Sequence, residues 1–398
     1  MDYLCRQATE GAAMLPFAKP IPRCAKLWLA LAFMLAACAC GPKTRAQAQQ
    51  TCVQAAPAGP FAWGETTHVA DAGWGRMIHL HGARWLCVDN LYPRPNSLLQ
   101  IQISADNACT WTPLATVAEP GRNLDNGNLA LMPNDTLLLT GRSVVSATNS
   151  RGEAVRSYHL PVYQSRDGGK TWTFLSQIDT SEPPPHLPGG PSVGLWEPFL
   201  FLLPSGKVAC AYANEKHAQE RPAFSQTVAE RVSPDGGKTW GREITLAAQP
   251  GGGGQRPGMP VVARMVNGKY IAVYEIIGIG EGDVYYKTSA DGKTWARGIG
   301  TPIAGQHQEP WVASLQSGRL LVTSCENQVC YSDDLGATWL LASPPPFPIG
   351  HNLSWPAIYQ TGPDEIAAMV TWHGVNLRRG HVLPLPRVPT AALRAAKR

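Results

Sequence analysis

The phrase Ser-x-Asp-x-Gly-x-Thr-Trp, complete or slightly altered, occurs five times in this 398-residue chain. The copies begin at Ser104, Ser165, Ser233, Ser289 and Ser332. A supersecondary unit of roughly fifty residues therefore recurs, which is the period expected of propeller blades. The repeat predicts a β-propeller.

Each copy of the phrase has the composition of a hairpin turn. Asp accepts hydrogen bonds from the backbone of the turn, Gly adopts positive φ, and Trp leaves the turn to pack between strands. The phrase resembles the Asp box of sialidases and related propeller proteins, which implies that it joins the two outer strands of a blade, away from the central axis. We therefore expect structural rather than catalytic or calcium-binding roles for Asp106, Asp167, Asp235, Asp291 and Asp333.

The composition supports an all-β fold. The chain contains 39 Gly and 35 Pro and shows no long helical periodicity. Five boxes, plus a closing segment made by residues 350–380 joining residues 62–90, predict a six-bladed propeller of four-stranded antiparallel blades. The formal charge of +5 includes basic residues of both termini, so the body is near neutral and no nucleic-acid partner is expected.

The N-terminal segment has the pattern of an export signal. Basic residues precede the apolar run LWLALAFMLAA, and the following Leu-Ala-Ala-Cys38 resembles a bacterial lipoprotein signal, whose Cys is lipidated after cleavage. This predicts a periplasmic or cell-surface protein that a lipid on Cys38 holds to the membrane. Cys40 offers a second site, and ordinary secretion with cleavage near Ala46-Gln47-Ala48 is the alternative.

These observations divide the chain into four expected parts: a signal peptide with lipobox (1–38), a tether rich in Ala, Gln and Pro (39–60), the propeller (61–384) and a disordered basic tail (385–398). Export would permit disulfides among the ten cysteines, and the candidate pairs are Cys325 with Cys330 and Cys87 with Cys109. No Cys or His cluster has zinc-ligand spacing, so no metal bound by Cys or His is expected.

Two glutamates differ from the other acidic residues, most of which lie in turns or on polar strand faces. Glu197 stands between Trp196 and Pro198 at the start of an apolar strand, and Glu275 ends the apolar strand KYIAVYE. A carboxylate in such a position is partly desolvated, which raises its pKa and suits a group that holds a proton near neutral pH. Two carboxylates in one cleft are the minimal apparatus for glycoside hydrolysis.

The segments around these glutamates resemble a known enzyme family. LWEPFLFLLPSGKV, RPGMPVVARMVNGKYIAVYE and VYYKTSADGKTW, within roughly 190–300, are similar to the exo-1,5-α-L-arabinanases, six-bladed propeller glycoside hydrolases. The resemblance implies exo action on an arabinan-like polysaccharide and a retaining mechanism, with Glu197 as nucleophile and Glu275 as general acid/base. A retaining pair lies about 5–5.5 Å apart and an inverting pair about 6.5–9.5 Å apart. No cofactor is expected, and we expect a monomer.

Further residues are candidates for substrate binding. Arg256 follows a glycine run and either binds sugar hydroxyls and holds Glu197 ionised or is an exposed loop residue. The segment HQEPW, which contains Glu309, repeats the pattern of LWEPF, which contains Glu197. Glu at this position is therefore also consistent with a structural role that recurs in several blades. The candidate binding residues are Arg256, Arg94, Asp125, Asn126, Trp196, Asn214 and Glu309.

Two other functions remain open. A sialidase would need three arginines around the carboxylate of its sugar, and here Arg94, in a broken motif, Arg256 and Arg378 would have to supply them. A membrane-tethered propeller without catalytic activity could bind glycans or an envelope protein, since propellers serve many functions. This last alternative predicts that Glu197 and Glu275 lie far apart or on different faces.

Overall fold

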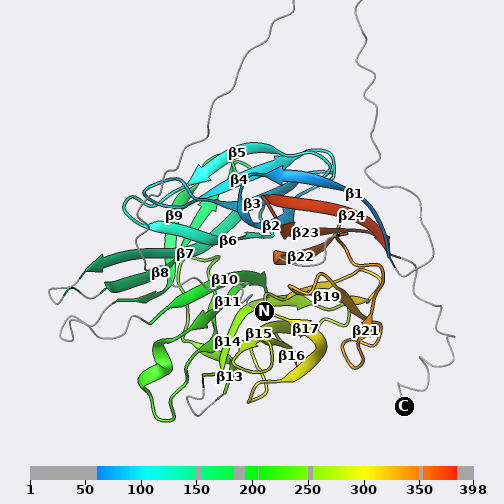
Figure 1. The fold of residues 1–398 in the computed structure, drawn as a ribbon. Coiled ribbons are helices and arrows are strands. Elements are labelled where there is room, and N and C mark those ends of the chain that lie inside the picture. The colour runs from blue at the N-terminus through cyan, green and yellow to red at the C-terminus, as the bar shows by residue number, and fades with distance from the viewer. Residues whose placement is uncertain are drawn as a thin grey trace, which may run out of the picture. The chain divides into compact units, whose positions relative to one another are not determined.

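The structure is a computed structural model that describes residues 61–148, 152, 154–182, 193–204, 206–249, 254–348 and 353–382. These residues form six antiparallel sheets of four strands each (Figure 1). They all belong to the compact unit Cys52–Arg398, whereas the unit Met1–Thr51 lies outside the described residues. The predicted all-β, six-bladed propeller is confirmed, and the expected signal peptide, Cys38, tether and basic tail lie outside the described residues.

Each blade contains four strands, which are named below from the centre outward. Blades 1 to 3 are β2 (Gly73–His79), β3 (Trp85–Leu91), β4 (Leu98–Ser104), β5 (Thr112–Val117); β6 (Asn123–Leu131), β7 (Leu137–Thr148), β8 (Ala154–Ser165), β9 (Thr173–Ser181); and β10 (Leu195–Leu202), β11 (Val208–Asn214), β12 (Thr227–Ser233), β13 (Ile244–Ala248). A short 3-10 helix, η1 (Lys216–Gln219), follows β11.

The remaining three blades follow the same order. Blades 4 to 6 are β14 (Arg256–Arg264), β15 (Tyr270–Ile277), β16 (Asp283–Ser289), β17 (Thr301–His307); β18 (Trp311–Ser314), β19 (Leu320–Thr323), β20 (Val329–Ser332), β21 (Leu340–Leu341); and β22 (Ser354–Gln360), β23 (Glu365–Thr371), β24 (Val375–Val382), β1 (Phe61–Ala70).

The first strand of the propeller closes the ring. β1 pairs with β24, from Phe61 opposite Val382 to Ala70 opposite Val375, and is the outermost strand of blade 6 (Figure 1). Because β1 pairs with β24, the outer edge of β24 is covered, and residues from both ends of the described chain complete blade 6. The predicted closure is correct for residues 61–70, while β2 and β3 open blade 1.

Apolar side chains fill the spaces between neighbouring blades. Leu99 of blade 1 belongs to one buried cluster with Leu137 of blade 2, and Leu138 belongs to the next with Tyr212 of blade 3. Burial of this apolar surface stabilises the ring at roughly 25 cal/mol per Å² removed from water. The core is thus spread between blades, as expected for this architecture.

The repeated phrase forms the turns between the two outer strands of blades 1 to 5. In blade 2, Ser165 Oγ donates to Asp167 Oδ1 at 2.8 Å and accepts the Gly169 N–H at 2.9 Å, while Thr171 Oγ1 donates to Asp167 Oδ2 at 2.6 Å. The same Ser-to-Asp bond occurs at Asp106, Asp235 and Asp291. These aspartates hold turns together, as predicted.

The fifth box requires a correction, because Asp334 and not Asp333 occupies the turn position. Ser332 Oγ and Thr338 Oγ1 donate to Asp334 at 2.8 and 2.7 Å, whereas Asp333 pairs with Arg319 Nε at 2.7 Å. The turn aspartate always lies two residues after the serine, and in this copy that position is 334.

The irregular copies also form turns. In the first box, which lacks glycines, Asn107 and Ala108 adopt φ values of 59° and 64°, where the second box has Gly168 and Gly169 at 77° and 92°. In the shorter fourth box, Thr294 Oγ1 still donates to its aspartate at 3.0 Å. Loss of the preferred residues therefore leaves the turn geometry intact.

The predicted disulfides are not present. The structure contains no bond between Cys325 and Cys330, and Cys87 is a buried thiol. Cys109 is disulfide-bonded, and its partner is not among the described residues. Cys87 lies on β3 with its sulfur against the backbone of its own strand, so it packs as a small apolar side chain.

In the innermost strand of five blades, and just before that strand in blade 5, lies one residue at positive φ that is followed by Pro or Gly. In five blades this residue lies in a β-bulge, where the register of the first two strands shifts. A bulge re-aims one side chain and ends regular pairing. We call these six positions the bulge residues: Trp74, Asn126, Glu197, Met259, Glu309 and Trp355, with φ between 45° and 59°.

Candidate active site

The bulge residues and the Asp boxes lie at opposite ends of the strands. In blade 4, Tyr270 pairs with Ser289 at the start of the box, whereas Glu275 pairs with Val284 near the other end of the same two strands. The aspartates of the boxes are therefore remote from Glu275. Any site around the glutamates therefore lies at the end of the strands that carries the bulge residues.

Glu197 and Glu275 contact two consecutive residues of β14. The backbone N–H of Met259 donates to the Glu197 carboxylate, and a methyl group added at Gly258 would lie 3.7 Å from Glu275 Oε1. Both carboxylates are buried, with 8% and 3% of each residue exposed. Burial has the largest effect on the pKa of Glu275 and raises it. The hydrogen bond from the Glu309 N–H lowers this pKa, and charge repulsion from Glu197 raises it. The structure thus brings the two predicted residues together on one face, contrary to the expectation for a non-catalytic propeller.

The bulges are tied to the preceding blade through their backbone N–H groups. Glu309 N–H donates to Glu275 Oε2 at 2.7 Å, Trp355 N–H donates to Glu309 Oε2 at 2.5 Å, and Trp74 N–H donates to Thr371 Oγ1 at 3.0 Å. A buried N–H without a partner is unfavourable, so these acceptors stabilise the ring. Glu309 therefore has the structural role that the repeated Glu-Pro pattern suggested as an alternative to substrate binding.

Burial shifts the protonation of both candidate glutamates. It raises the pKa of Glu197 to about 7, although Arg142 opposes this shift by favouring the charged form. It raises the pKa of Glu275 to about 8, and here the N–H of Glu309 opposes the shift while the charge of Glu197 adds to it. Both carboxyl groups therefore keep a proton to higher pH than an exposed glutamate does.

Arg142, on β7, was not identified from the sequence. Its guanidinium makes two hydrogen bonds to Asp125, of 2.8 and 2.7 Å, and lies 4.6 Å from the ring centre of Trp196. Asp125 is thus committed to an ion pair rather than facing a substrate. An alignment of the blades would have identified Arg142. It pairs with Asp125, the residue before the bulge residue of blade 2, just as Glu275 pairs with Gly258, the residue before the bulge residue of blade 4.

Arg256, one of the predicted binding residues, is held by protein groups. It donates to Glu215 Oε1 at 2.5 Å and to Gln226 Oε1 at 2.7 Å. Its charge lowers the pKa of both Glu197 and Glu275, although burial has the largest effect on each and raises it. Arg256 therefore lies beside the site and favours ionised carboxylates, while its hydrogen bonds fix its position.

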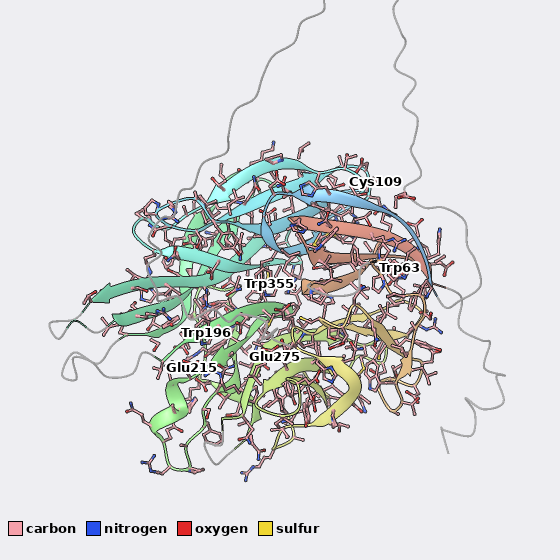
Figure 2. The ribbon with its side chains drawn as sticks, viewed as in Figure 1. Trp63, Cys109, Trp196, Glu215, Glu275 and Trp355 are labelled. Carbon is pink, nitrogen blue, oxygen red and sulfur yellow. The ribbon has the colours of Figure 1, made fainter. Side chains whose placement is uncertain are left out.

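Aromatic residues surround the carboxylates. Trp196 is half-buried against Tyr158, with ring centres 5.2 Å apart, whereas Tyr274 is fully buried and donates to Ile299 O at 2.7 Å. Of the two aromatic neighbours of the glutamates, Tyr274 is thus the core residue. Figure 2 shows Trp196, Glu275 and Trp355 around the middle of the ring.

Trp74, Trp355 and Arg76 line the centre opposite these groups and were missed in the sequence. The buried Arg76 guanidinium lies 4.4 Å from the ring centre of Trp74 and donates to Trp355 O at 2.8 Å. A central pocket lined by inner-strand residues includes Trp74, Arg76 and Glu197. The sequence did contain a signal for the two tryptophans, because Trp74-Gly and Trp355-Pro occupy the same repeat position as Glu197-Pro.

Two of the predicted binding residues lie elsewhere. Asn214 is fully buried and donates to Glu243 Oε2 at 2.9 Å, so it organises the η1 loop instead of reaching the cleft. Arg94 is exposed in the turn between β3 and β4. Glu215, the residue after Asn214, does lie beside the site, where it accepts hydrogen bonds from Arg256 and from the Gly194 N–H.

The three arginines proposed for a sialidase do not converge. Arg378 lies on β24 of blade 6 and donates to Gly64 O and Pro346 O, at 2.6 and 2.7 Å. Arg256 is bound to Glu215. Among the described residues, these contacts leave no arginine cluster of the expected composition beside Glu197.

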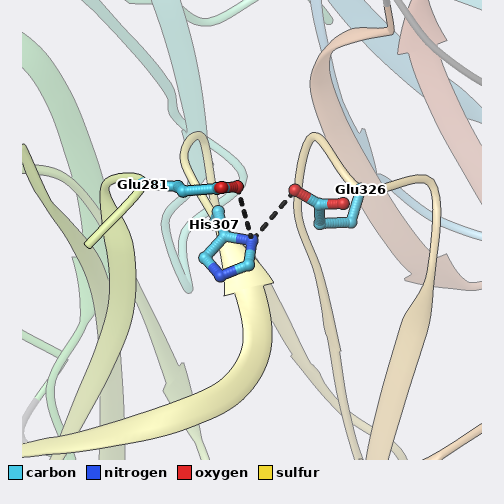
Figure 3. Close-up of side chains that lie close together, drawn as sticks. All are labelled: Glu281, His307 and Glu326. Carbon is cyan, nitrogen blue, oxygen red and sulfur yellow. Dashed lines mark hydrogen bonds and ion pairs between the residues drawn. The ribbon is translucent and has the colours of Figure 1, made fainter.

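One group of side chains in the described part of the chain has the composition of a cation site. Glu281, His307 and Glu326 offer ligand atoms within 4.8 Å of one another at the junction of blades 4 and 5 (Figure 3). His307 Nδ1 lies 2.9 Å from Glu326 Oε1 and 4.0 Å from Glu281 Oε2. Because hydrogen bonding of the His307 ring between two exposed carboxylates accounts for the same contacts without an ion, the cluster is interpreted as a polar contact between blades 4 and 5.

Comparison with solved structures identifies the same architecture in glycosidases. The GH93 α-L-arabinofuranosidase of Fusarium graminearum, in complex with arabinobiose, has a TM-score of 0.66 and 21% identity over 80% of this chain and 98% of its own. The α-L-arabinanase of Penicillium chrysogenum, also with arabinobiose, has a TM-score of 0.66 and 22% identity over 81% and 100%. At these identities the similarity establishes the fold.

A sialidase shares the fold more distantly. The NanB sialidase of Streptococcus pneumoniae has a TM-score of 0.54 and 11% identity, over 82% of this chain and 71% of its own. No curated protein matches the sequence. A family model described as a BNR repeat-like domain matches residues 97–327, more than half of the chain. The chain belongs to the BNR repeat-like domain family.

Proposed function

We propose that the protein is a retaining, exo-acting glycoside hydrolase that releases sugar units from the end of an arabinan-like polysaccharide. The observation that carries this proposal is the pair of buried carboxylates, Glu197 and Glu275, that contact consecutive residues of β14 and differ in pKa, at about 7 and about 8. A carboxylate pair with separated pKa values supports one ionised and one protonated role at the same pH.

The environments favour Glu197 as the nucleophile. Arg142 and Arg256 both lower its pKa, against the larger opposing effect of burial, and so stabilise its carboxylate form. Glu275 has the higher pKa and serves as the acid. This assignment agrees with the order of roles that the family resemblance implies.

In the first step the Glu197 carboxylate attacks the anomeric carbon and forms an ester. The glycosidic C–O bond breaks, and the proton of Glu275 moves to the leaving oxygen. In the second step Glu275 accepts a proton from water, the resulting oxygen nucleophile attacks the anomeric carbon, and the ester bond to Glu197 breaks. The sugar leaves with its original anomeric configuration, and both glutamates return to their starting states.

Arabinan is proposed as the substrate on two grounds. The segments around Glu197 and Glu275 resemble the exo-arabinanases, and both fungal enzymes of similar fold were solved with arabinobiose.

The test is product release from linear arabinan, sialyllactose and a panel of aryl glycosides by wild type and Glu197→Gln. The glutamine keeps an oxygen for the Met259 N–H, so loss of activity reports chemistry rather than folding. Hydrolysis of arabinan by wild type and about 10²- to 10⁴-fold less by the variant supports the proposal. Equal rates for wild type and Glu197→Gln would contradict the catalytic assignment. Cleavage of sialyllactose alone favours a sialidase. Binding of a sugar without cleavage favours a propeller that binds glycans without catalysis.

We also propose that the protein is exported and anchored through a lipid on Cys38. The lipobox pattern supports this, and the disulfide at Cys109 is the state expected in an oxidising compartment. The test compares membrane and soluble fractions of cells producing wild type or Cys38→Ser. A shift of the variant to the soluble fraction is expected, whereas an unchanged distribution contradicts the anchor.

A further inference from the structure

Asn126 occupies the same position in blade 2 as Glu197 in blade 3. Both are bulge residues at positive φ, 51° and 45°, and each has 8% of its surface exposed. The next residue, Gly127, lines the central pocket together with Glu197. The preceding residue, Asp125, pairs with the Arg142 that faces Glu197. Asn126 therefore stands in the blade next to the proposed nucleophile, between two residues that border its site.

Its side chain differs from those of comparable bulge residues. Glu197 accepts the Met259 N–H, Glu309 accepts the Trp355 N–H, and Trp74 Nε1 donates to Gly127 O at 2.9 Å. The Oδ1 atom of Asn126 is buried and has no hydrogen-bond partner among the described residues. An unpaired buried amide oxygen is unfavourable, so such an atom beside a cleft indicates a group that a ligand completes.

The charges around Asn126 restrict what that ligand can be. Arg142 is paired with Asp125, Arg256 is paired with Glu215, and Arg76 donates to backbone carbonyls. Arg142 and Arg256 are therefore neutralised by carboxylates, whereas the buried Arg76 has no carboxylate partner among the described residues and is held by backbone carbonyls and the Trp74 ring. A carboxylate on the substrate would meet the ionised Glu197 and be repelled.

We propose that Asn126 is the specificity-determining residue of a subsite for an uncharged sugar, with its amide oxygen accepting a hydrogen bond from a ring hydroxyl. This inference rests on the proposed function, because it takes Glu197 as the centre of the reaction. An amide suits the task, since it offers an acceptor and two donors without adding charge. The subsite takes neutral pentose or hexose units and excludes uronic and sialic acids.

The test is calorimetric binding of arabinobiose and of digalacturonate to Glu197→Gln, alone and combined with Asn126→Gly. Glycine adopts φ of 51° without strain, so the change removes the amide alone. The matched control is Asp135→Gly, an exposed positive-φ residue in the turn at the other end of the same blade, with φ 62°. We expect Asn126→Gly to weaken arabinobiose binding about 10- to 100-fold and the control to leave it unchanged. Digalacturonate should not bind.

A panel of methyl arabinofuranosides, each lacking one hydroxyl, then identifies the contact. Removing the hydroxyl that Asn126 binds should cost affinity in the protein that keeps Asn126 and almost none in the Asn126→Gly variant. Equal binding by Asn126→Gly, an equal loss on every analogue, or binding of digalacturonate overturns the inference. Hydrolysis by wild type is measured separately, so an inactive protein that still binds arabinobiose through Asn126 overturns the proposed function alone.

Discussion

The backbone N–H of Glu309 donates a 2.7 Å hydrogen bond to Oε2 of Glu275, across the junction of blades 4 and 5. This contact fixes one oxygen of the proposed acid. The other, Oε1, lies 3.7 Å from the position that a methyl group on Gly258 would take. Oε2 therefore anchors the Glu275 side chain to the next blade.

The three Glu-containing sites should respond differently to the same substitution. Glu309→Gln keeps an acceptor for the Trp355 N–H and should change activity by less than about tenfold, whereas Glu197→Gln and Glu275→Gln should lose about 10²- to 10⁴-fold. Glu309→Ala leaves a buried N–H without a partner and should lower the free energy of unfolding by about 1–3 kcal/mol. Initial rates and urea unfolding measure both effects. A loss at Glu309→Gln as large as at Glu275→Gln would assign Glu309 to the chemistry.

The rate should depend on pH through both glutamates. With pKa values of about 7 for Glu197 and about 8 for Glu275, kcat/KM should follow a narrow bell. It should fall below pH about 7 as Glu197 becomes protonated, and above pH about 8 as Glu275 loses its proton. Rates on an aryl arabinofuranoside from about pH 5 to about pH 10 test this. A flat profile across that range would contradict the proposed protonation states.

Much of the fold was predictable from the repeated phrase, because its turn chemistry is local. Ser165, Asp167 and Thr171 bond to one another within a single short turn, so the box could be read without knowing the rest of the structure. The register error at Asp333 arose because two adjacent aspartates follow Ser332 and only the geometry shows which one enters the turn.

The site was predictable only in part, because its contacts join blades far apart in the sequence. Glu197 and Glu275 stood out through apolar neighbours and family resemblance. Arg142, by contrast, carries no local motif, and its role depends on Asp125 and Trp196 in two other strands. Asn214 was misassigned because nothing local indicates that the η1 loop encloses it.

Removing the Arg142 charge should shift the acidic side of the pH profile. Arg142 lowers the pKa of Glu197, although burial has the larger, opposite effect, so its loss should raise that pKa further. The double variant Asp125→Asn with Arg142→Gln avoids leaving one member of the ion pair unmatched. Its acidic limb should move to higher pH while the alkaline limb, set by Glu275, stays in place. Movement of the alkaline limb alone would show that Arg142 does not act on Glu197.

Stability should fall as pH rises, in part through Glu230. This fully buried residue lies away from the site, where its Oε2 accepts the Trp295 Nε1–H at 2.8 Å, and burial raises its pKa from 4.5 to about 8. A raised folded-state pKa means that its contribution is present below about pH 4.5 and is lost as pH rises through about 8.

Glu230→Gln should therefore flatten the pH dependence of the free energy of unfolding between about pH 5 and about pH 9, since glutamine keeps the acceptor for Trp295. Each pKa unit corresponds to about 1.4 kcal/mol. Urea unfolding at several pH values measures the slopes. Parallel curves for the variant and wild type would mean that Glu230 titrates alike in the folded and unfolded states.

The most direct test of the glutamate pair is the mass of the intact Glu275→Gln protein after mixing with dinitrophenyl α-L-arabinofuranoside. Its reactive leaving group needs no acid, whereas release of the sugar from the enzyme needs Glu275 as base, so the ester should accumulate. We predict an added anhydropentose that peptide mapping places on Glu197. An adduct on another residue, or no adduct together with full activity of Glu197→Gln, would contradict the assignment.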